Sequence, residues 1–285
     1  MKLSPEQLHE LADFAIKAAR RAGLLIAQKS KEHFSVNMKT GGDSLASQVF
    51  TEVDLASEQV IIETLKPTIE QYELALLSEE TTDDHSRFKK DYFWCIDPLD
   101  GTLPFIEQTD GYSVSIALVD KNGVAHIGVI YNPVDGTLYH AIKGQGAFKN
   151  NKQWLLPVPG TNLTLVCDRS FLRNKNYQAT TDKLQDLSLS DIKIISHGGA
   201  AMNAMWVIEN HPAIYFKQAK AESGGGSLWD YAASSCIFSE IGAYARSFNG
   251  DALDLNRKES TFMNHKGILY TTDHEIVASI KTLLI

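Results

Sequence analysis

Apolar residues recur every three or four positions over residues 5–30, a spacing that predicts one long amphipathic helix. A second helix is expected at 51–66, where Thr51 and Asp54 form a candidate capping box and Pro67 is expected to end the helix. Residues 36–50 between these helices are polar and contain glycine. They indicate a loop or a short hairpin.

From residue 73 the pattern changes to apolar strands, which we expect at 73–78, 92–97, 112–120, 124–134 and 136–144. Their short connections favour an antiparallel sheet. The second half alternates expected strands at 163–168, 191–196, 213–217 and 267–272 with expected helices at 176–187, 200–209, 229–241 and the C-terminus. This order predicts an α+β fold, a layered α-β-α-β sandwich in which helix pairs cover two sheets. The turn-rich residues 150–160 are expected to separate two halves, 1–155 and 156–285, of one compact catalytic unit.

Charge and composition exclude several classes of protein. The net charge of −8 and the absence of a basic stripe argue against a nucleic-acid polymer as partner. No apolar run approaches the roughly 18 residues that span a bilayer, and the N-terminus lacks a signal-peptide core. Three cysteines without metal-like spacing indicate reduced thiols, so a cytoplasmic location is expected.

Acidic residues follow the apolar strands. Glu79 comes after the strand at 73–78, Asp97 and Asp100 end the strand at 92–97, and Asp230 stands where an apolar helix begins. Carboxylates at strand ends and a helix start can converge at one edge of a sheet. Hard oxygen ligands without nearby His or Cys indicate Mg²⁺, Mn²⁺ or Ca²⁺, and such an ion would neutralise the acids.

Gly101 and Thr102 follow directly after Asp100, and Pro104 suits the first turn of a helix. Backbone N–H groups at a helix start bind anions. Acids that bind a metal, next to a helix start that binds an anion, together indicate a phosphomonoesterase. Each motif also has a plainer explanation: Asp230 as a helix cap, residues 78–80 as a solvated turn, and residues 97–101 as a simple turn. The residues alone leave these alternatives open.

Three motifs in this order and separation, SEE at 78–80, DPLDGT at 97–102 and WDYAA at 229–233, resemble the inositol monophosphatase superfamily. The resemblance covers nearly the whole chain. It implies the layered fold of the sugar-phosphatase and inositol monophosphatase type, lithium sensitivity, and two or three Mg²⁺ ions, with Mn²⁺ as a substitute and Ca²⁺ inhibitory. The metal ligands it implies are Glu79, Asp97, Asp100, Asp230 and the carbonyl of Leu99.

The resemblance also implies catalytic roles. Thr102, hydrogen-bonded to Asp54, would orient and deprotonate the attacking water, and Glu79 would act with them. Glu80 would act only through a water. The N–H groups of Gly101 and Thr102 would hold the phosphate.

Three further segments, at 97–118, 165–171 and 253–264, are similar to the bacterial 3'(2'),5'-bisphosphate nucleotidases. This likeness implies adenosine 3',5'-bisphosphate as substrate. Arg169 lies in the second of these segments, and Lys217 would assist a second phosphate. The segment 197–203 resembles a family segment whose backbone touches the leaving group. Its plainer explanation is a helix start with small residues for packing. The substrate-binding residues so implied are Gly101, Thr102, Gly198, Gly199, Ala200, Lys217, Arg169 and Asp230.

Departures from the nucleotidase pattern at 41–51, 103–104 and 219–228 keep two alternatives open. One is an inositol monophosphatase or another sugar phosphatase of the same superfamily. The other, more remote, is a non-catalytic protein that binds a phosphorylated metabolite. The partner expected in each case is a small phosphorylated metabolite. The resemblance to the superfamily also implies that two copies of this chain form a homodimer.

Overall fold

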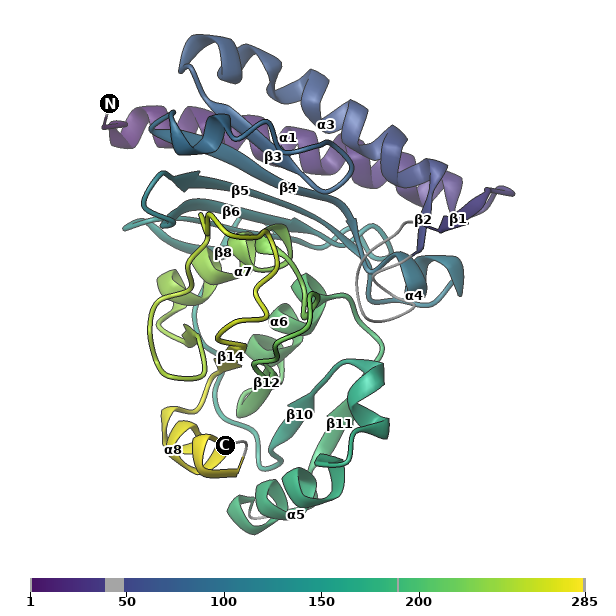
Figure 1. Ribbon diagram of the computed structural model, residues 1–285, viewed down its shortest axis with the longest axis vertical. Coiled ribbons are helices and arrows are strands. Elements are labelled where there is room, and N and C mark those ends of the chain that lie inside the picture. Colours follow the sequence, from purple (N-terminus) through teal and green to yellow (C-terminus); the bar gives the residue numbers. More distant parts are fainter. Residues whose placement is uncertain (1, 39–48, 189, 284–285) are drawn as a thin grey trace.

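Five layers build the structure, in the order helices, sheet, helices, sheet, helices (Figure 1). This computed structural model describes residues 2–38, 49–188 and 190–283. The expected α-β-α-β sandwich is confirmed, and α5 (Tyr177–Leu187) and α8 (His274–Leu283) add a fifth layer. Of the expected loop or hairpin at 36–50, the structure describes the strands β1 (Val36–Met38) and β2 (Val49–Thr51), which pair antiparallel. Residues 39–48 lie outside the described residues.

Two long helices, α1 (Pro5–Lys29) and α3 (Glu52–Gln71), form the first layer. The capping box of Thr51 and Asp54 starts α3 as expected, but the expectation that Pro67 ends the helix is wrong. Pro67 is exposed, so the carbonyl that loses its helical partner lies on the solvent side. The next residue, Thr68, is buried and accepts a hydrogen bond from Trp94 Nε1 at 3.0 Å, which fixes the final turn.

The first sheet has seven strands, in the spatial order of the chain. They are β3 (Ala75–Ser78), β4 (Tyr92–Asp100), β5 (Ser113–Asp120), β6 (Ala125–Tyr131), β7 (Leu138–Ile142), β8 (Gly146–Lys149) and β9 (Lys152–Trp154). The expected antiparallel pairing fails only at β3, which runs parallel to β4. The connection 79–91, with the 3₁₀ turn η1 (Ser86–Phe88), is long enough to return the chain to the same end of the sheet. The sequence pattern missed β8 and β9, which are short and only partly buried.

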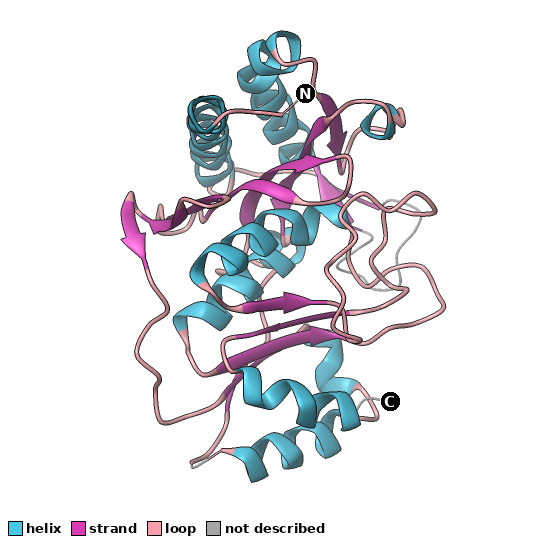
Figure 2. Cartoon of the chain, turned by 90° about the vertical axis from the view of Figure 1, so that its left-hand side faces the viewer, coloured by secondary structure: helices cyan, strands magenta, loops and turns pink. Residues whose placement is uncertain are grey.

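Helices α6 (Ala200–Glu209) and α7 (Leu228–Ile241) lie between the two sheets (Figure 2). Helix α7 packs on β4, β5, β6 and β7, while α1 and α3 cover the opposite face of that sheet. Because both faces are covered, all nine residues of β4 are buried. This burial explains the continuous apolar run at the start of β4 and makes its acidic end exceptional.

The second sheet has the order β11 (Lys193–Ile195), β10 (Thr164–Val166), β12 (Ala213–Lys217), β14 (Ile268–Thr271) and β13 (Tyr244–Arg246). Strand β10 runs parallel to β11 and β12, so the carboxyl ends of β10 and β12 share one edge. Asp168 follows β10 at this edge, and Lys217 ends β12 there. Helices α5 and α8 cover the far face of this sheet.

The described helices include none with the length and apolarity needed to cross a membrane. The three cysteines, Cys95, Cys167 and Cys236, are buried and unpaired. Burial raises the pKa of the Cys95 thiol, which keeps it protonated. Cys95 is therefore a core residue, as expected, and not a nucleophile.

Candidate metal centre and active site

The carboxyl end of β4 carries two acids separated by three positions. Side chains alternate between the two faces of a regular strand, so this spacing would place Asp97 and Asp100 on opposite faces. The pairing of β4 with β5 is regular as far as Asp97 and resumes only at Asp100, so the residues between them form a bulge. The hydroxyl of Ser57 donates to the carbonyl of Pro98 in this bulge at 2.7 Å. The bulge turns both carboxylates toward α7.

Asp230 in the first turn of α7 completes a cluster with these two residues. Carboxylate oxygens of Asp97, Asp100 and Asp230 all lie within 4.8 Å of one another. Asp97 and Asp100 are buried, and Asp230 is partly buried. Asp230 also accepts a hydrogen bond from the N–H of Ser227 at 2.5 Å, so it caps α7 while it faces the cluster. The cap and the cluster are compatible roles of one side chain.

The cluster is short of positive charge. Burial and the nearby charge of Asp230 raise the pKa of Asp100 to about 8, although hydrogen bonds from Ala200 and Ala201 and the charge of Lys217 oppose this. Burial also raises the pKa of Asp230, and Lys217 opposes the rise. Three acids with oxygen donors and no adjacent His or Cys ligand suit a hard divalent cation such as Mg²⁺.

The other expected metal ligands lie next to this cluster. Glu79 follows β3, and its N–H donates to the carbonyl of Ile96 at 3.2 Å, which places its backbone beside Asp97. Its carboxylate is not a member of the group of three. The Leu99 carbonyl lies in the bulge, 3.3 Å from the hydroxyl of Thr102. The charge of Glu80 acts on Asp54, so Glu80 lies toward α3. Metal ligation by Glu79 and Leu99 stays a prediction.

Thr102 starts the short helix α4 (Thr102–Ile106) and donates its hydroxyl to Asp54 Oδ1 at 3.0 Å. The second oxygen of Asp54 accepts from the N–H and the hydroxyl of Thr51, at 2.7 and 2.6 Å. Asp54 therefore holds both the start of α3 and the start of α4. Burial raises the pKa of Asp54 to about 6, against these hydrogen bonds.

Gly101 joins the acidic strand to α4. Its φ of 86° is left-handed, and a Cβ there would lie 2.8 Å from the carbonyl oxygen of Gly111. Both the backbone conformation and the close approach of a neighbouring loop therefore require glycine at this position.

The start of α6 has a different environment from the one expected. The N–H groups of Ala200 and Ala201 each donate to Asp100 at 2.9 Å, and the N–H of Gly199 donates to the carbonyl of Gly111 at 2.7 Å. A Cβ on Gly199 would collide with the Asp100 carboxylate. The N–H groups of Ala200 and Ala201 therefore hold Asp100 in place. Contact of the backbone of Gly198, Gly199 and Ala200 with a leaving group stays a prediction.

The two basic residues expected to bind substrate are both bound by acids. Lys217 Nζ lies 3.0 Å from Asp168 Oδ2. Arg169 makes a two-pronged ion pair with Glu107, at 2.7 and 2.8 Å, on the exposed surface. The sequence did not predict these two ion pairs, because the partners are distant along the chain. Substrate binding by Lys217 and Arg169 stays a prediction.

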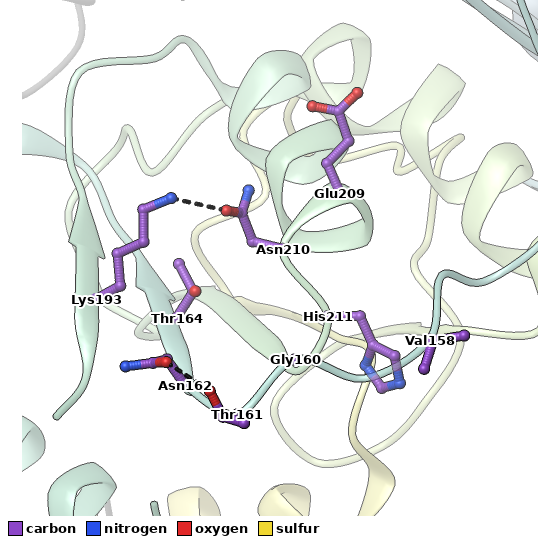
Figure 3. Close-up of a pocket in the computed structure, with 9 residues that line it drawn as sticks. All are labelled: Val158, Gly160, Thr161, Asn162, Thr164, Lys193, Glu209, Asn210 and His211. Carbon is purple, nitrogen blue, oxygen red and sulfur yellow. Dashed lines mark hydrogen bonds between the residues drawn. The ribbon is translucent and has the colours of Figure 1, made fainter. Parts of the chain in front are cut away.

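A cavity of about 540 Å³ lies away from these residues (Figure 3). It is lined by the amino ends of β10 and β11 and by residues that precede β12, and Lys193 bonds to Asn210 across it at 2.9 Å. Its lining includes none of the expected site residues. Asp168 and Lys217 lie at the opposite, carboxyl edge of the parallel strands β10 and β12, and the charge of Lys217 acts on Asp230 of the acidic cluster. The cavity is therefore not the candidate active site.

Sequence reasoning missed several residues that support the site. Glu58 is buried on α3 one turn after Asp54, and it accepts a hydrogen bond from the Thr81 hydroxyl at 2.9 Å. Ser57 holds the bulge in β4. The T-x-x-D-x-x-S-E pattern of residues 51–58 could have indicated them, because Asp54, Ser57 and Glu58 share one helix face. Asp168 could have been found by the rule that identified Asp97, an acid after an apolar strand.

Known proteins resemble this chain along nearly its full length. A sequence model described as the inositol monophosphatase family matches residues 7–283. Inositol-1-monophosphatase of Bacillus subtilis is 27% identical over 278 residues, which are 95% of this chain and 98% of that protein. Nus factor SuhB of Pasteurella multocida is 29% identical over 85% of this chain and 87% of its own length.

A solved structure, the extragenic suppressor protein SuhB of Bartonella henselae, has the same fold. Its TM-score is 0.75 at 22% identity, over 95% of this chain and 97% of that one. The expected likeness to bisphosphate nucleotidases is not supported, because these relatives are named inositol monophosphatase and SuhB.

Proposed function

The chain belongs to the inositol monophosphatase family, and from this premise we propose that it is a magnesium-dependent phosphomonoesterase for a monophosphate ester of inositol or a related polyol. The observation that carries the proposal is the convergence of Asp97, Asp100 and Asp230 within 4.8 Å. A buried cluster of three acids is unfavourable by itself and becomes favourable around a cation. A protein that only bound a metabolite would have no need of it.

The three acids fit magnesium and would hold it. Their donors are all oxygen, and burial together with the charge of Asp230 raises the pKa of Asp100, a cost that a bound cation would remove. Glu79 and the carbonyl of Leu99 are the further ligands we propose, with two or three ions in total and Mn²⁺ as a substitute. When bound, magnesium lowers the pKa of the attacking water and stabilises the leaving oxygen.

Thr102 is proposed to orient the water. Its hydroxyl donates to Asp54 at 3.0 Å, so a lone pair of Thr102 Oγ1 is left to accept a hydrogen bond from water. If Thr102 takes a proton from that water, its own proton passes to the carboxylate of Asp54. Asp54 in turn is held by Thr51. The N–H groups of Gly101 and Thr102, next to Asp100, are proposed to hold phosphate oxygens as charge shifts to them.

The ion pairs of the two basic residues, Lys217 and Arg169, favour a monophosphate substrate over a bisphosphate. Lys217 is paired with Asp168 and only 19% exposed, so its charge is not free to neutralise a second phosphate, and the charge of Arg169 is largely screened by solvent. The names of the relatives favour inositol monophosphate in the same direction. Adenosine 3',5'-bisphosphate, the substrate indicated by the sequence motifs, is the second candidate.

Phosphate release from inositol 1-phosphate, fructose 1,6-bisphosphate and adenosine 3',5'-bisphosphate, with and without Mg²⁺, tests the proposal. We expect Mg²⁺-dependent release with inositol 1-phosphate preferred. Asp97→Asn removes a buried charge from the cluster, and a loss of several kcal/mol in transition-state stabilisation corresponds to at least about a thousandfold in rate. The matched control is Asp186→Asn on the exposed side of α5, which should keep full activity.

Three outcomes contradict the proposal. Near-normal turnover by Asp97→Asn would exclude the metal centre. Preference for adenosine 3',5'-bisphosphate would restore the nucleotidase hypothesis. Binding of all three compounds without release of phosphate would favour a non-catalytic protein.

A further inference from the structure

Lys217 is a cation beside the acidic cluster. It ends β12, lies over the ring of Tyr231 with its ammonium 5.7 Å from the ring centroid, and acts electrostatically on Asp230. Its side chain is 19% exposed, so solvent screens its charge only in part. An anionic group of a substrate close to Asp230 would therefore lie near this charge.

Asp168 neutralises that cation and is itself firmly held. Its Oδ2 lies 3.0 Å from Lys217 Nζ. Its Oδ1 accepts hydrogen bonds from the hydroxyl of Tyr215 at 3.0 Å and from the side chain of Asn203 at 3.4 Å. Donors from β12 and α6 therefore fix the carboxylate in position. The Lys217–Asp168 pair has no net charge.

We propose that Asp168 determines substrate specificity by excluding a second phosphate. A second phosphate near Lys217 would also approach the fixed carboxylate of Asp168, and repulsion would cancel the attraction. A hydroxyl group, by contrast, can donate to Asp168 and accept from Lys217. The pair thus favours polyol monophosphates. This inference rests on the proposed function and deepens it.

The Arg169–Glu107 pair provides a matched comparison. It too joins a basic residue to an acid, but the side chains are 44% and 38% exposed. Exposed pairs are screened and contribute little. Release of Arg169 should therefore have little effect on a bound substrate, whereas release of Lys217 should have a large one.

Steady-state kinetics of Asp168→Asn test the inference, with inositol 1-phosphate, inositol 1,4-bisphosphate and adenosine 3',5'-bisphosphate as substrates. Asn keeps the shape and one acceptor oxygen while Lys217 loses its counter-charge. We expect KM for both bisphosphates to fall about tenfold, with kcat changed less than about threefold. KM for inositol 1-phosphate should rise, because its hydroxyl group loses a charged acceptor, so the ratio of the KM values shifts toward the bisphosphates. Glu107→Gln should leave the ratio of the KM values as in the wild type.

Two further variants keep the test valid if the unpaired lysine destabilises Asp168→Asn. The double variant Asp168→Asn/Lys217→Gln removes both charges and should return the KM ratio to that of the wild type. Lys217→Gln alone leaves Asp168 negative and should weaken bisphosphate binding further. Melting temperatures report whether each variant folds.

An unchanged KM ratio in Asp168→Asn, or an equal shift in Glu107→Gln, would overturn the specificity role of Asp168. Wild-type hydrolysis of inositol 1-phosphate would then still support the proposed function. Absence of hydrolysis of every substrate by the wild type would instead overturn the proposed function itself.

Discussion

Two walls of the site are held together in different ways. The wall from α3 and β4 is held by hydrogen bonds between buried groups, Asp54 with Thr102 and Ser57 with the carbonyl of Pro98. The wall from β10 and β12 is held by the partly exposed ion pair of Lys217 with Asp168, and the exposed pair of Arg169 with Glu107 joins the segment after β10 to the end of α4. The first wall is rigid because a broken bond there leaves a buried polar group without a partner.

This difference separates two tasks. Alignment of a water and of metal ligands requires groups fixed to within a fraction of an ångström, which buried hydrogen bonds provide. Selection among substrates requires only a charge pattern, and one substitution in an ion pair can change that pattern without moving the backbone. We infer that the first wall serves the reaction and the second wall serves specificity.

Removal of the Thr102 hydroxyl should have the largest effect on the first wall. Thr102→Val keeps the shape of the side chain but loses the bond to Asp54, and general acid–base assistance is worth about 10²–10⁴ in rate. We expect kcat to fall by at least about a hundredfold with KM little changed. Thr102→Ser keeps the hydroxyl and should retain most of the activity. Near-normal kcat in Thr102→Val would contradict the catalytic role of the hydroxyl.

Removal of metal should leave the carboxylates of Asp97, Asp100 and Asp230 without a neutralising cation and so make the stability of the protein depend on pH. In the metal-free protein the pKa of Asp100 is raised to about 8 by burial and by Asp230, against about 3.9 in an unfolded chain. The folded state then holds a proton that the unfolded state has lost. The free energy of unfolding should therefore fall as the pH rises from about 4 to about 8.

Magnesium should reverse this trend, because it replaces the proton as the neutralising charge. At a hundredfold excess over its Kd it should add about 2.7 kcal/mol to the free energy of unfolding. Urea denaturation at about pH 5 and about pH 8, with chelator or with Mg²⁺, measures both effects. Stability in chelator that does not decrease over this range would contradict the electrostatic account of the cluster.

The smallest expected effect is on the stability of two serine variants, one from each half of the chain. Ser57→Ala leaves the buried carbonyl of Pro98 without its donor and should cost about 1–3 kcal/mol of stability. Ser190→Ala removes an exposed bond to the Thr161 carbonyl and should cost less than about 0.5 kcal/mol. Chemical denaturation of both variants provides the test. Similar losses would show that the α3 wall is no more rigid than the surface of the other half.

Local patterns predicted much of the fold and part of the site. The apolar run of β4, its acidic end and the capping box at Thr51 and Asp54 all depend on residues that are close in the sequence. The continuation of α3 through Pro67 could not be predicted, since it depends on which side of the helix faces solvent. The parallel pairing of β3 depends on the path of a connection, which a strand pattern does not contain.

The sequence by itself determined the chemical groups of the candidate site: carboxylates at strand ends, a glycine where the backbone must be left-handed, and a hydroxyl beside the acids. These properties belong to residue types and short spacings. Only the tertiary structure decided which charges are available to a substrate. Lys217 is neutralised by Asp168 and Arg169 by Glu107 across different strands and loops. The physical reason is that an ion pair depends on distance in space, and the fold brings together residues that are far apart along the chain.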